Sequence, residues 1–409
     1  MTGASPSRAQ ANRGRGLGPP DGQGAGPPRE DEVAFEPEGE AGGGAAARGG
    51  DECDESNACD DGVEIEPNEG DVPDGLIQGP VRGRGSGLNP ASRFDDVRLH
   101  VLGTHLEEVA SQHPGGRQVV TRILPDHTRE ILNAVDSPDI HFRWTVNPYR
   151  GCEHGCIYCY ARPGHEYFGL SSGLDFETII YAKHEAPNLL RKALAKPGWA
   201  GEPITFSGVT DCYQPIEREL GLTRQCLEVC QAARQPVSII TKNHLITRDI
   251  DLLTQFASWN GVHAAVSLTT LDNRLASAME PRASSPRQRL AAIEALAKAG
   301  VPVAVMTAPI IPGLNDREIP ALLKAAKEAG AHAAGWVMLR LPHQLKALFL
   351  EWLQREFPDR AAHVESLIRQ VRGGELSDPR PGTRMTGEGP IATHIAHTFK
   401  VFAGRLGLP

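Results

Sequence analysis

The sequence predicts an α/β protein whose core is a partial (β/α)6 barrel. Between about residues 141 and 340, short β-type runs alternate six times with helical patterns. Strand and helix repeated in this way produce parallel strands joined by right-handed crossovers. Eight repeats would close a full TIM-type barrel, so six repeats indicate an open one. In both arrangements, reactive groups belong on the loops that follow the C-terminal ends of the strands.

Apolar and β-branched residues mark the predicted strands, as is usual for strands with a buried face. The first run, FRWTVN, directly precedes a cysteine-rich loop, and the fifth, VPVAVMTAPII, is the longest. The six expected strands cover residues 142–147, 203–208, 237–241, 262–268, 301–311 and 333–339.

Helical patterns occupy the intervals between these strands. After the second and third strands, apolar residues recur on one helix face, and we expect Thr247 to cap the helix after the third. The apolar positions are Leu220, Leu227 and Cys230, followed by Ile250, Leu253 and Ala257.

The helix after the fourth strand carries clear end signals. Ser285 is a suitable N-cap, Pro286 fits the first helical position, and Gly300 is a natural C-terminal stop. After the fifth strand, Asn315 or Asp316 is expected to open a helix that runs to residue 330.

Three further segments flank the barrel region. Residues 1–95 are rich in Gly, Pro, Asp and Glu, and are predicted to be a disordered tail. Residues 96–140 are predicted to be an ordered N-terminal segment. Residues 341–409 are predicted to form a helical extension, with helices near 345–357 and 391–402 that cover the open mouth of the barrel.

Charge is distributed unevenly along the chain. Between Arg29 and Asp74, 17 acidic residues oppose two arginines, and this part is expected to be a solubilising or interaction segment. Residues 75–409 therefore carry +4, although the whole chain carries -9. The mildly basic remainder permits a nucleic-acid partner.

Cysteine usage and hydropathy indicate the compartment. No run approaches the length of a membrane span, and the N-terminus lacks the apolar stretch of a secretory signal. Eight cysteines in 409 residues are too few for a disulfide scaffold, and six of them lie between residues 152 and 230. In a reducing compartment such clustering indicates metal binding or catalysis. We therefore expect a cytoplasmic protein with no membrane contact.

The most informative stretch is NPYRGCEHGCIYCYARPGH, residues 147–165. Its thiols, Cys152, Cys156 and Cys159, have the spacing C-x3-C-x2-C. Thiolates are soft ligands for iron–sulfur clusters and zinc. Three cysteines that bind three corners of a [4Fe–4S] cluster leave the fourth iron open to a small molecule. The alternative is structural zinc, which requires four ligands and could be completed by His154 or His165.

The pattern C-x3-C-x-Φ-C at the end of the first strand resembles the radical SAM superfamily, and the resemblance extends over about residues 140–340. It implies that the open iron binds S-adenosylmethionine (SAM). A reductant such as flavodoxin or ferredoxin then supplies the electron that cleaves SAM to methionine and a 5′-deoxyadenosyl radical. The resemblance also implies that Tyr158, before the third cysteine, packs near the adenine.

The flanking motif N-x-x-R-G-C-x-H-x-C-x-Y-C-Y-A-R is similar to the group that contains spore photoproduct lyase and its DNA repair photolyase-like relatives. This resemblance implies SAM contacts on the loops after successive strands. Ser207 aligns with the serine after the second strand. The implied contacts are Thr210 and Asp211 for the amino group, Lys242 for the ribose or carboxylate, Ser267 for the ribose, Arg282 for the carboxylate, and Ile310 and Ile311 for the adenine.

One position departs from the lyase pattern. The lyase has a hydrogen-donating cysteine beside the second-strand serine, whereas this sequence has Gly208 there. Cys212, four residues further on, is the remaining candidate for a catalytic hydrogen donor. A nucleic-acid base is the leading substrate prediction. A peptide or small metabolite, and a non-catalytic zinc or iron–sulfur module, are the alternatives.

Several other residues have both a functional and a structural interpretation. Glu217 is either a ligand contact or a helix N-terminal glutamate, and Cys226 and Cys230 are expected to be small core residues. Arg150 and His154 are expected to shape the cysteine loop through hydrogen bonds. Candidate contacts for an anionic substrate near the predicted mouth are Arg340, His343 and Arg384.

Overall fold

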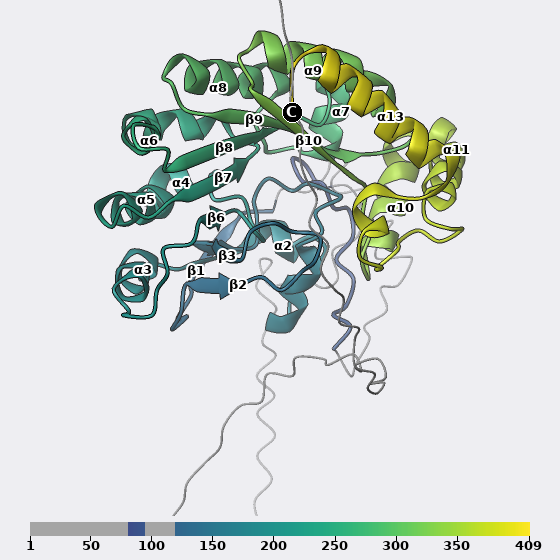
Figure 1. The fold of residues 1–409 in the computed structure, drawn as a ribbon. Coiled ribbons are helices and arrows are strands. Elements are labelled where there is room, and N and C mark those ends of the chain that lie inside the picture. The colour runs from purple at the N-terminus through teal and green to yellow at the C-terminus, as the bar shows by residue number, and fades with distance from the viewer. Residues whose placement is uncertain (1–80, 95–118) are drawn as a thin grey trace, which may run out of the picture. The chain divides into compact units, whose positions relative to one another are not determined.

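A seven-stranded sheet lies at the centre of the protein (Figure 1). This computed structural model describes residues 81–94 and 119–409. The strand order is β10-β9-β8-β7-β6-β3-β2. Neighbouring strands from β3 to β10 are all parallel, and β2 pairs antiparallel with β3. The strands are β2 (Leu132–Ala134), β3 (Trp144–Val146), β6 (Ile204–Phe206), β7 (Val237–Thr241), β8 (Val262–Ser267), β9 (Val303–Ile310) and β10 (Ala333–Met338).

The six parallel strands occupy the six predicted positions in chain order, which confirms the α/β prediction. Among the described strands, β2 and β10 end the sheet and do not pair with each other, so the arrangement is open. The pairing register between β9 and β10 shifts between Trp336 and Met338, where β9 contains one residue more than β10.

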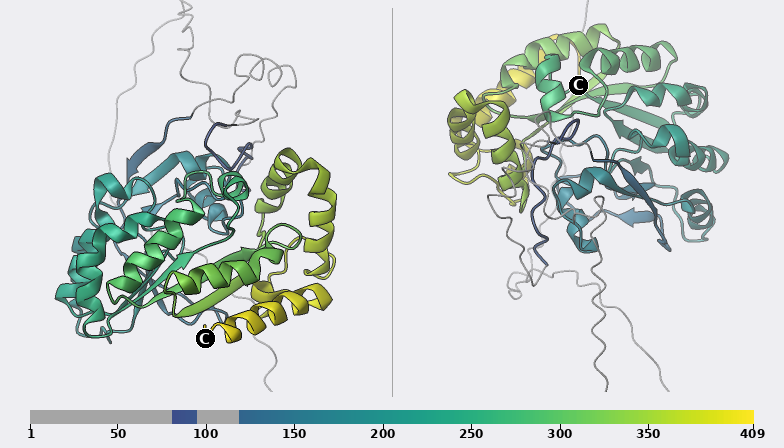
Figure 2. Two further views of the ribbon diagram at one scale, coloured as in Figure 1. Left: turned by 90° about the horizontal axis from the view of Figure 1, so that it is seen from above. Right: turned by 180° about the vertical axis from the view of Figure 1, so that it is seen from behind.

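Helices flank the outer side of these strands (Figures 1 and 2). Their apolar faces form one large core with the strands, including Leu227, Leu253, Ile293 and Leu323, because parallel strands need cover on both faces. The helices between strands are α3 (Ala186–Leu194), α4 (Glu217–Leu220), α5 (Leu222–Ala232), α6 (Ile250–Ala257), α7 (Asn273–Met279), α8 (Pro286–Lys298) and α9 (Ile319–Glu328), with 3-10 segments η3 (His244–Asp249) and η4 (Asp316–Glu318).

The helix boundaries test the predicted caps. The prediction for α8 is confirmed, since Ser285 and Gln288 form a capping box and Pro286 stands at the first helical position. The prediction for Thr247 is wrong, because Thr247 lies inside η3 and the side chain of Asn243 accepts the bond from the amide of Leu245. Asn315 precedes η4, but its side chain gives no cap there.

A second, three-stranded sheet has no counterpart in the prediction. It has the order β1-β5-β4, with β1 (Arg122–Pro125), β4 (Tyr149–Arg150) and β5 (Ile179–Ala182). The helices η2 (Arg162–Phe168) and α2 (Asp175–Thr178) lie between β4 and β5 in the chain. This small sheet places β4 directly before the three cysteines.

Residues 81–94, here called the strap, correct the predicted boundary of the N-terminal tail. They fall within the predicted disordered residues 1–95, yet Val81, Arg84, Ser86 and Asn89 are buried. The amides of Gly85 and Ser86 donate to the buried carboxylate of Glu177. The rest of the predicted tail, and residues 95–118 of the predicted ordered segment, lie outside the described residues.

The C-terminal extension is helical, as predicted. It comprises α10 (Leu345–Glu356), α11 (Pro358–Gln370), α12 (Thr383–Thr386) and α13 (Gly389–Arg405). Leu348, Phe349 and Trp352 of α10 form a core with Ile157 and Tyr158 of the cysteine-rich loop. Thus α10 covers this loop, whereas α13 packs beside α9 on the outside (Figures 1 and 2). No described helix combines the length and apolar character that a membrane crossing requires.

Candidate functional site

The cysteine loop, residues 151–161, is anchored by main-chain bonds to several parts of the fold. The Cys152 amide donates to the Phe176 carbonyl (2.9 Å), and the Ile157 amide donates to the Met279 carbonyl at the end of α7 (3.0 Å). The buried side chain of Gln214, from the loop after β6, binds both the Glu153 amide and the Gly151 carbonyl. The loop therefore lies where the C-terminal ends of the parallel strands meet.

All three loop thiols are free. Cys152 and Cys156 are buried, and Cys159 is partly buried. Burial, with the neighbouring Asp211, Glu280 and thiols, raises the pKa of Cys152 and Cys156. Burial also raises the pKa of Cys159, against the effect of Arg162. A bound cation would reverse this preference, because metal ligation requires the thiolate.

Within residues 81–94 and 119–409, no three His, Cys, Asp or Glu side chains are arranged to hold a single metal ion. A single ion needs ligands that converge on one point, whereas the thiolates of a cubane bind separate irons. Three soft donors on one buried loop thus fit the donor set of a [4Fe–4S] cluster.

The two histidines proposed to complete a zinc site both have protein partners. His154 Nδ1 lies 3.3 Å from Asp211 Oδ2, and its Nε2 lies 3.3 Å from Asn243 Nδ2. His165 Nε2 contacts the Ile179 carbonyl at 3.0 Å, and burial lowers the pKa of this imidazole to about 4. Both rings are thus engaged in contacts that hold the surrounding loops together.

Asp211 joins the cysteine loop to the loops after β6 and β7. It accepts hydrogen bonds from Thr241 Oγ1 (2.7 Å) and from the Lys242 amide (2.8 Å), and it contacts His154. Burial alone would raise the pKa of Asp211, but His154 and the hydrogen bonds outweigh burial and lower it to about 2. His154 therefore shapes the loop as expected, while Arg150 instead pairs with Asp126 at 2.5 Å.

Tyr158 belongs to a buried polar group that the sequence did not indicate. Its hydroxyl donates to Glu280, which also accepts from Thr269 and pairs with the buried Arg289. The Lys242 ammonium lies 5.8 Å from the centre of the Tyr158 ring. The cysteine loop, β7 and the end of α7 therefore converge at Tyr158, which fixes the orientation of its ring.

The predicted residues after β6 adopt a strained turn. Ser207 has φ +77°, and its Oγ accepts from the Cys212 amide at 2.8 Å. A Cβ on Gly208 would lie 2.8 Å from Thr145, so no larger residue fits there without movement. The Thr210 hydroxyl donates to the Tyr149 carbonyl.

Cys212, the predicted hydrogen donor, is 0 % exposed and belongs to the main hydrophobic core. Cys226 and Cys230 lie fully buried in the same core, as expected for small core residues. None of these thiols has exposed surface, and the role of Cys212 as a hydrogen donor stays a prediction.

The remaining predicted SAM contacts already have protein partners. The Ile311 amide donates to Asn315, its carbonyl accepts from Leu314, and the Ile310 carbonyl accepts from Leu339. Ser267 ends β8 and is buried. The Arg282 guanidinium lies 3.1 Å from Glu153 and contacts Thr121, which bridges to Arg84 of the strap. Their roles in SAM binding stay predictions.

Of the two roles considered for Glu217, a ligand contact and a glutamate at a helix N-terminus, its contacts fit the second. It is fully buried, and it accepts bonds from the Tyr149 hydroxyl (2.5 Å) and from the Thr223 amide in the first turn of α5 (2.9 Å). The Arg248 guanidinium lies 2.7 Å from the Glu217 carboxylate and balances its charge. A carboxylate at a helix N-terminus is favourable for the helix dipole.

A fully buried ion pair packs against the cysteine loop and bonds to its main chain. Arg162 and Glu177 are both 0 % exposed and lie 2.5 Å apart. Arg162 also donates to the Cys156 carbonyl at 3.0 Å, and Glu177 accepts from the strap amides. The strap approaches so closely that a Cβ on Gly85 would lie 2.0 Å from the Gly155 carbonyl. The sequence gives one sign of this close approach, the glycine-rich run RGRGSG in the strap.

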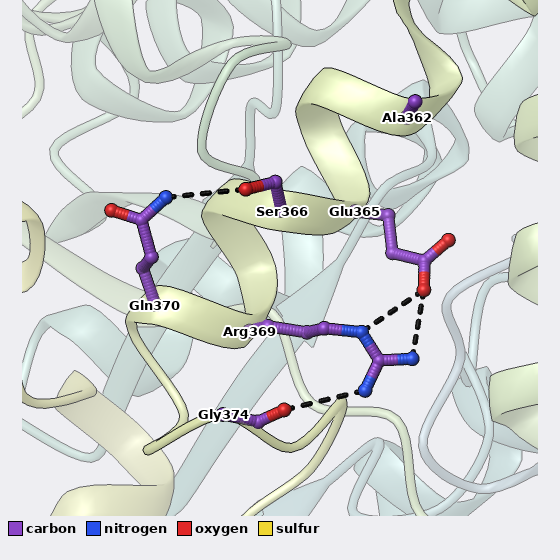
Figure 3. Close-up of a pocket in the computed structure, with 6 residues that line it drawn as sticks. All are labelled: Ala362, Glu365, Ser366, Arg369, Gln370 and Gly374. Atoms are coloured by element: carbon purple, nitrogen blue, oxygen red, sulfur yellow. Dashed lines mark hydrogen bonds and ion pairs between the residues drawn. The ribbon is translucent and has the colours of Figure 1, made fainter.

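A separate pocket of about 480 Å³ lies at the C-terminal end of α11 (Figure 3). The Arg369 guanidinium is bound there by Glu365 and by the Gly374 carbonyl. Its polar groups thus satisfy one another, and the pocket includes no residue of the cysteine loop.

Comparison with known proteins identifies the family. The model of the radical SAM superfamily matches residues 146–326, the part that contains the cysteine loop and the four parallel strands β6 to β9. The chain belongs to the radical SAM superfamily. It is therefore a radical SAM enzyme, and the cofactors of that superfamily are a [4Fe–4S] cluster and SAM.

Relatives of this radical SAM protein extend from actinobacteria to phages. The uncharacterised protein Rv2578c of Mycobacterium tuberculosis is 36 % identical over 245 residues, which cover 59 % of this chain and 72 % of the relative. A radical SAM Nalpha-GlyT isomerase of Pseudomonas phage M6 is 26 % identical over 232 residues, with 56 % and 46 % of the chains covered.

Among solved structures, spore photoproduct lyase complexed with dinucleoside spore photoproduct matches with a TM-score of 0.52 and 15 % identity. The match covers 75 % of this radical SAM chain and 93 % of the lyase. At this identity the similarity concerns the fold.

Proposed function

We propose that this radical SAM enzyme holds its cluster through Cys152, Cys156 and Cys159 and abstracts hydrogen from a nucleic-acid base. When bound, the cluster and SAM supply a 5′-deoxyadenosyl radical. The three thiols are the soft donors on the loop at the strand ends, where the fold places reactive groups. Their loop is held by the buried Arg162–Glu177 pair, so the protein can keep the donors in place before the cofactors bind.

The observation that carries the substrate proposal is the pair formed by Tyr160 and Arg340 beside the cluster loop. Tyr160 follows Cys159, is 52 % exposed, and donates to the Gly208 carbonyl at 2.6 Å. The Arg340 guanidinium lies 5.8 Å from the centre of this ring. An exposed ring beside a cation suits a base with its phosphate.

Arg340 has the character of an anion-binding residue. Burial and the nearby Arg384 lower the pKa of its guanidinium. Its guanidinium donates to Met385 Sδ at 3.5 Å, and among the described residues it forms no ion pair, although the charge of Asp139, which pairs with Arg384, acts on it. A partly desolvated guanidinium that makes no direct ion pair with a carboxylate is well suited to a phosphate. Arg384, in contrast, already pairs with Asp139.

The relatives support a base as the substrate. One solved lyase structure contains a dinucleoside photoproduct, and the phage relative is named a radical SAM Nalpha-GlyT isomerase. The hydrogen return of the lyase is not part of the proposal, because Gly208 has no side chain and Cys212 is buried. We propose a modification or isomerisation that does not use this thiol, with an electron from a flavodoxin- or ferredoxin-type reductant.

Anaerobic reconstitution with iron and sulfide tests the proposal. Reduced holoprotein should convert SAM to 5′-deoxyadenosine, and deuterium from a labelled oligonucleotide should appear in that product. Transfer of deuterium from labelled peptides, with none from oligonucleotides, would contradict the substrate class. The Arg340→Gln variant should bind oligonucleotides more weakly, with a salt dependence reduced by roughly one phosphate contact. The Arg405→Gln variant, on the distant α13, is the matched control.

A further inference from the structure

We propose that Arg93, Phe94 and Tyr167 form a docking surface for single-stranded nucleic acid next to the reaction site. This inference rests on the proposed function and extends it, because it concerns nucleotides that flank the target base. We call these three residues the aromatic stack. Phe94 and Arg93 come from the end of the strap, and Tyr167 comes from η2, which begins three residues after Cys159.

The aromatic stack exposes large flat surfaces to solvent. Phe94 is 55 % exposed and Tyr167 is 70 % exposed, and their ring centres are 5.3 Å apart. The Arg93 guanidinium lies 4.7 Å from the Phe94 ring centre and 5.5 Å from that of Tyr167. Exposed rings of this size are uncommon on a soluble surface without a partner, and here two of them share one cation.

The arginine of the stack is held in a fixed position. Its Nε lies 3.2 Å from the buried carboxylate of Glu166, and its amide also donates to that carboxylate. The acid that balances Arg93 is therefore under the surface, while the guanidinium and the rings face outward. A fixed arrangement of this kind loses little conformational entropy when a ligand binds.

The stack lies along a path that leads to the proposed substrate site. The loop between β10 and α10 begins with Arg340, beside Tyr160, and continues to His343. Burial lowers the pKa of His343, and the nearby charges of Arg93, Glu166 and Lys346 also affect it. Gln344 donates to the Ala91 carbonyl of the strap at 2.9 Å. This loop therefore connects the Tyr160–Arg340 pair to the aromatic stack.

The chemistry of this path favours a nucleic-acid strand over a peptide. Its exposed groups are the two rings and Arg93, with the partly buried cations Arg340 and Lys346 on the adjoining loop, while Glu166 is buried. Proteins bind single strands without sequence preference by stacking bases on aromatic rings and by contacting phosphates with cations. Proline-rich peptides also dock on aromatic surfaces, but they carry no phosphates for these cations to contact. The surface thus matches bases and phosphates.

Oligonucleotide affinity of the holoprotein is the direct test. Fluorescence anisotropy with a labelled single-stranded oligothymidylate should show binding that Tyr167→Ala weakens about 10-fold. Phe94→Ala should have a similar effect, whereas Tyr167→Phe keeps the ring and should stay within about twofold of wild type. Arg405→Gln is the matched control, because Arg405 lies 5.4 Å from the Phe402 ring on α13.

The outcomes separate this inference from the proposed function. Formation of 5′-deoxyadenosine without oligonucleotide should be equal in wild type and all variants, because the stack does not contact the cysteines. Wild-type binding that Tyr167→Ala and Phe94→Ala leave unchanged would overturn the docking surface alone. Changed thermal stability or oligomeric state with unchanged affinity would likewise overturn it and assign the rings to a protein contact. SAM cleavage without any oligonucleotide binding would overturn the nucleic-acid substrate itself.

Discussion

Replacing Glu177 with glutamine removes the negative charge that Arg162 contacts at 2.5 Å under the cysteine loop. Both side chains are 0 % exposed, so water cannot replace the lost charge. Glutamine also presents an amide group where Glu177 accepts bonds from the Gly85 and Ser86 amides. Loss of one partner from a buried pair typically costs about 3–5 kcal/mol, because the other charge stays buried. We expect Glu177→Gln to reduce the free energy of unfolding by about that amount.

Equilibrium unfolding of the apoprotein in urea, followed by circular dichroism, measures this change. The matched control is Glu294→Gln, which removes an exposed partner of Lys298 in α8 and should change the free energy of unfolding by less than about 0.5 kcal/mol. Because Arg162 also donates to the Cys156 carbonyl, the reconstituted variant should hold less iron than wild type. A loss below about 1 kcal/mol with full iron content would refute the supporting role of this ion pair.

Three other variants test separate parts of the structure. Gly85→Ala should lower thermal stability and iron content, because its Cβ would lie 2.0 Å from the Gly155 carbonyl, while Gly198→Ala, with open space around it, should change neither. Because burial lowers the pKa of His165 to about 4, the unfolded chain binds the extra proton between about pH 6.5 and 4. Wild-type stability should therefore fall by about 3 kcal/mol as pH decreases through that window, and a urea titration of His165→Phe should lack most of this slope. Cys212→Ala should keep both 5′-deoxyadenosine formation and product formation; a variant that cleaves SAM but forms no product would restore Cys212 as the hydrogen donor.

The sequence predicted the six parallel strands because their signals are local. Each parallel strand is a short run of β-type residues, and Ser285 with Pro286 marks the start of α8 through its own backbone geometry. The cysteine loop was equally evident, since three soft ligands share eight positions. Thr247 was misassigned because Asn243, four residues earlier, satisfies the local amides and η3 precedes α6.

The supports of the site depend on contacts between distant residues. The strap reaches Glu177 across more than 90 positions, and Tyr158 reaches Glu280 across 122. In both pairs, the sequence around one residue contains no pattern that identifies its partner. The burial of Cys212 was also hidden, because its position depends on the turn at Ser207 and on the packing of α5.

The yield of 5′-deoxyadenosine from SAM, measured after anaerobic reduction, tests the central claim most directly. Wild-type protein with a full cluster should form it, and single Ser variants of Cys152, Cys156 and Cys159 should form none, whereas Cys226→Ser should retain it. Formation of 5′-deoxyadenosine by any of the three loop variants at the wild-type rate would contradict the assignment of these cysteines to the cluster.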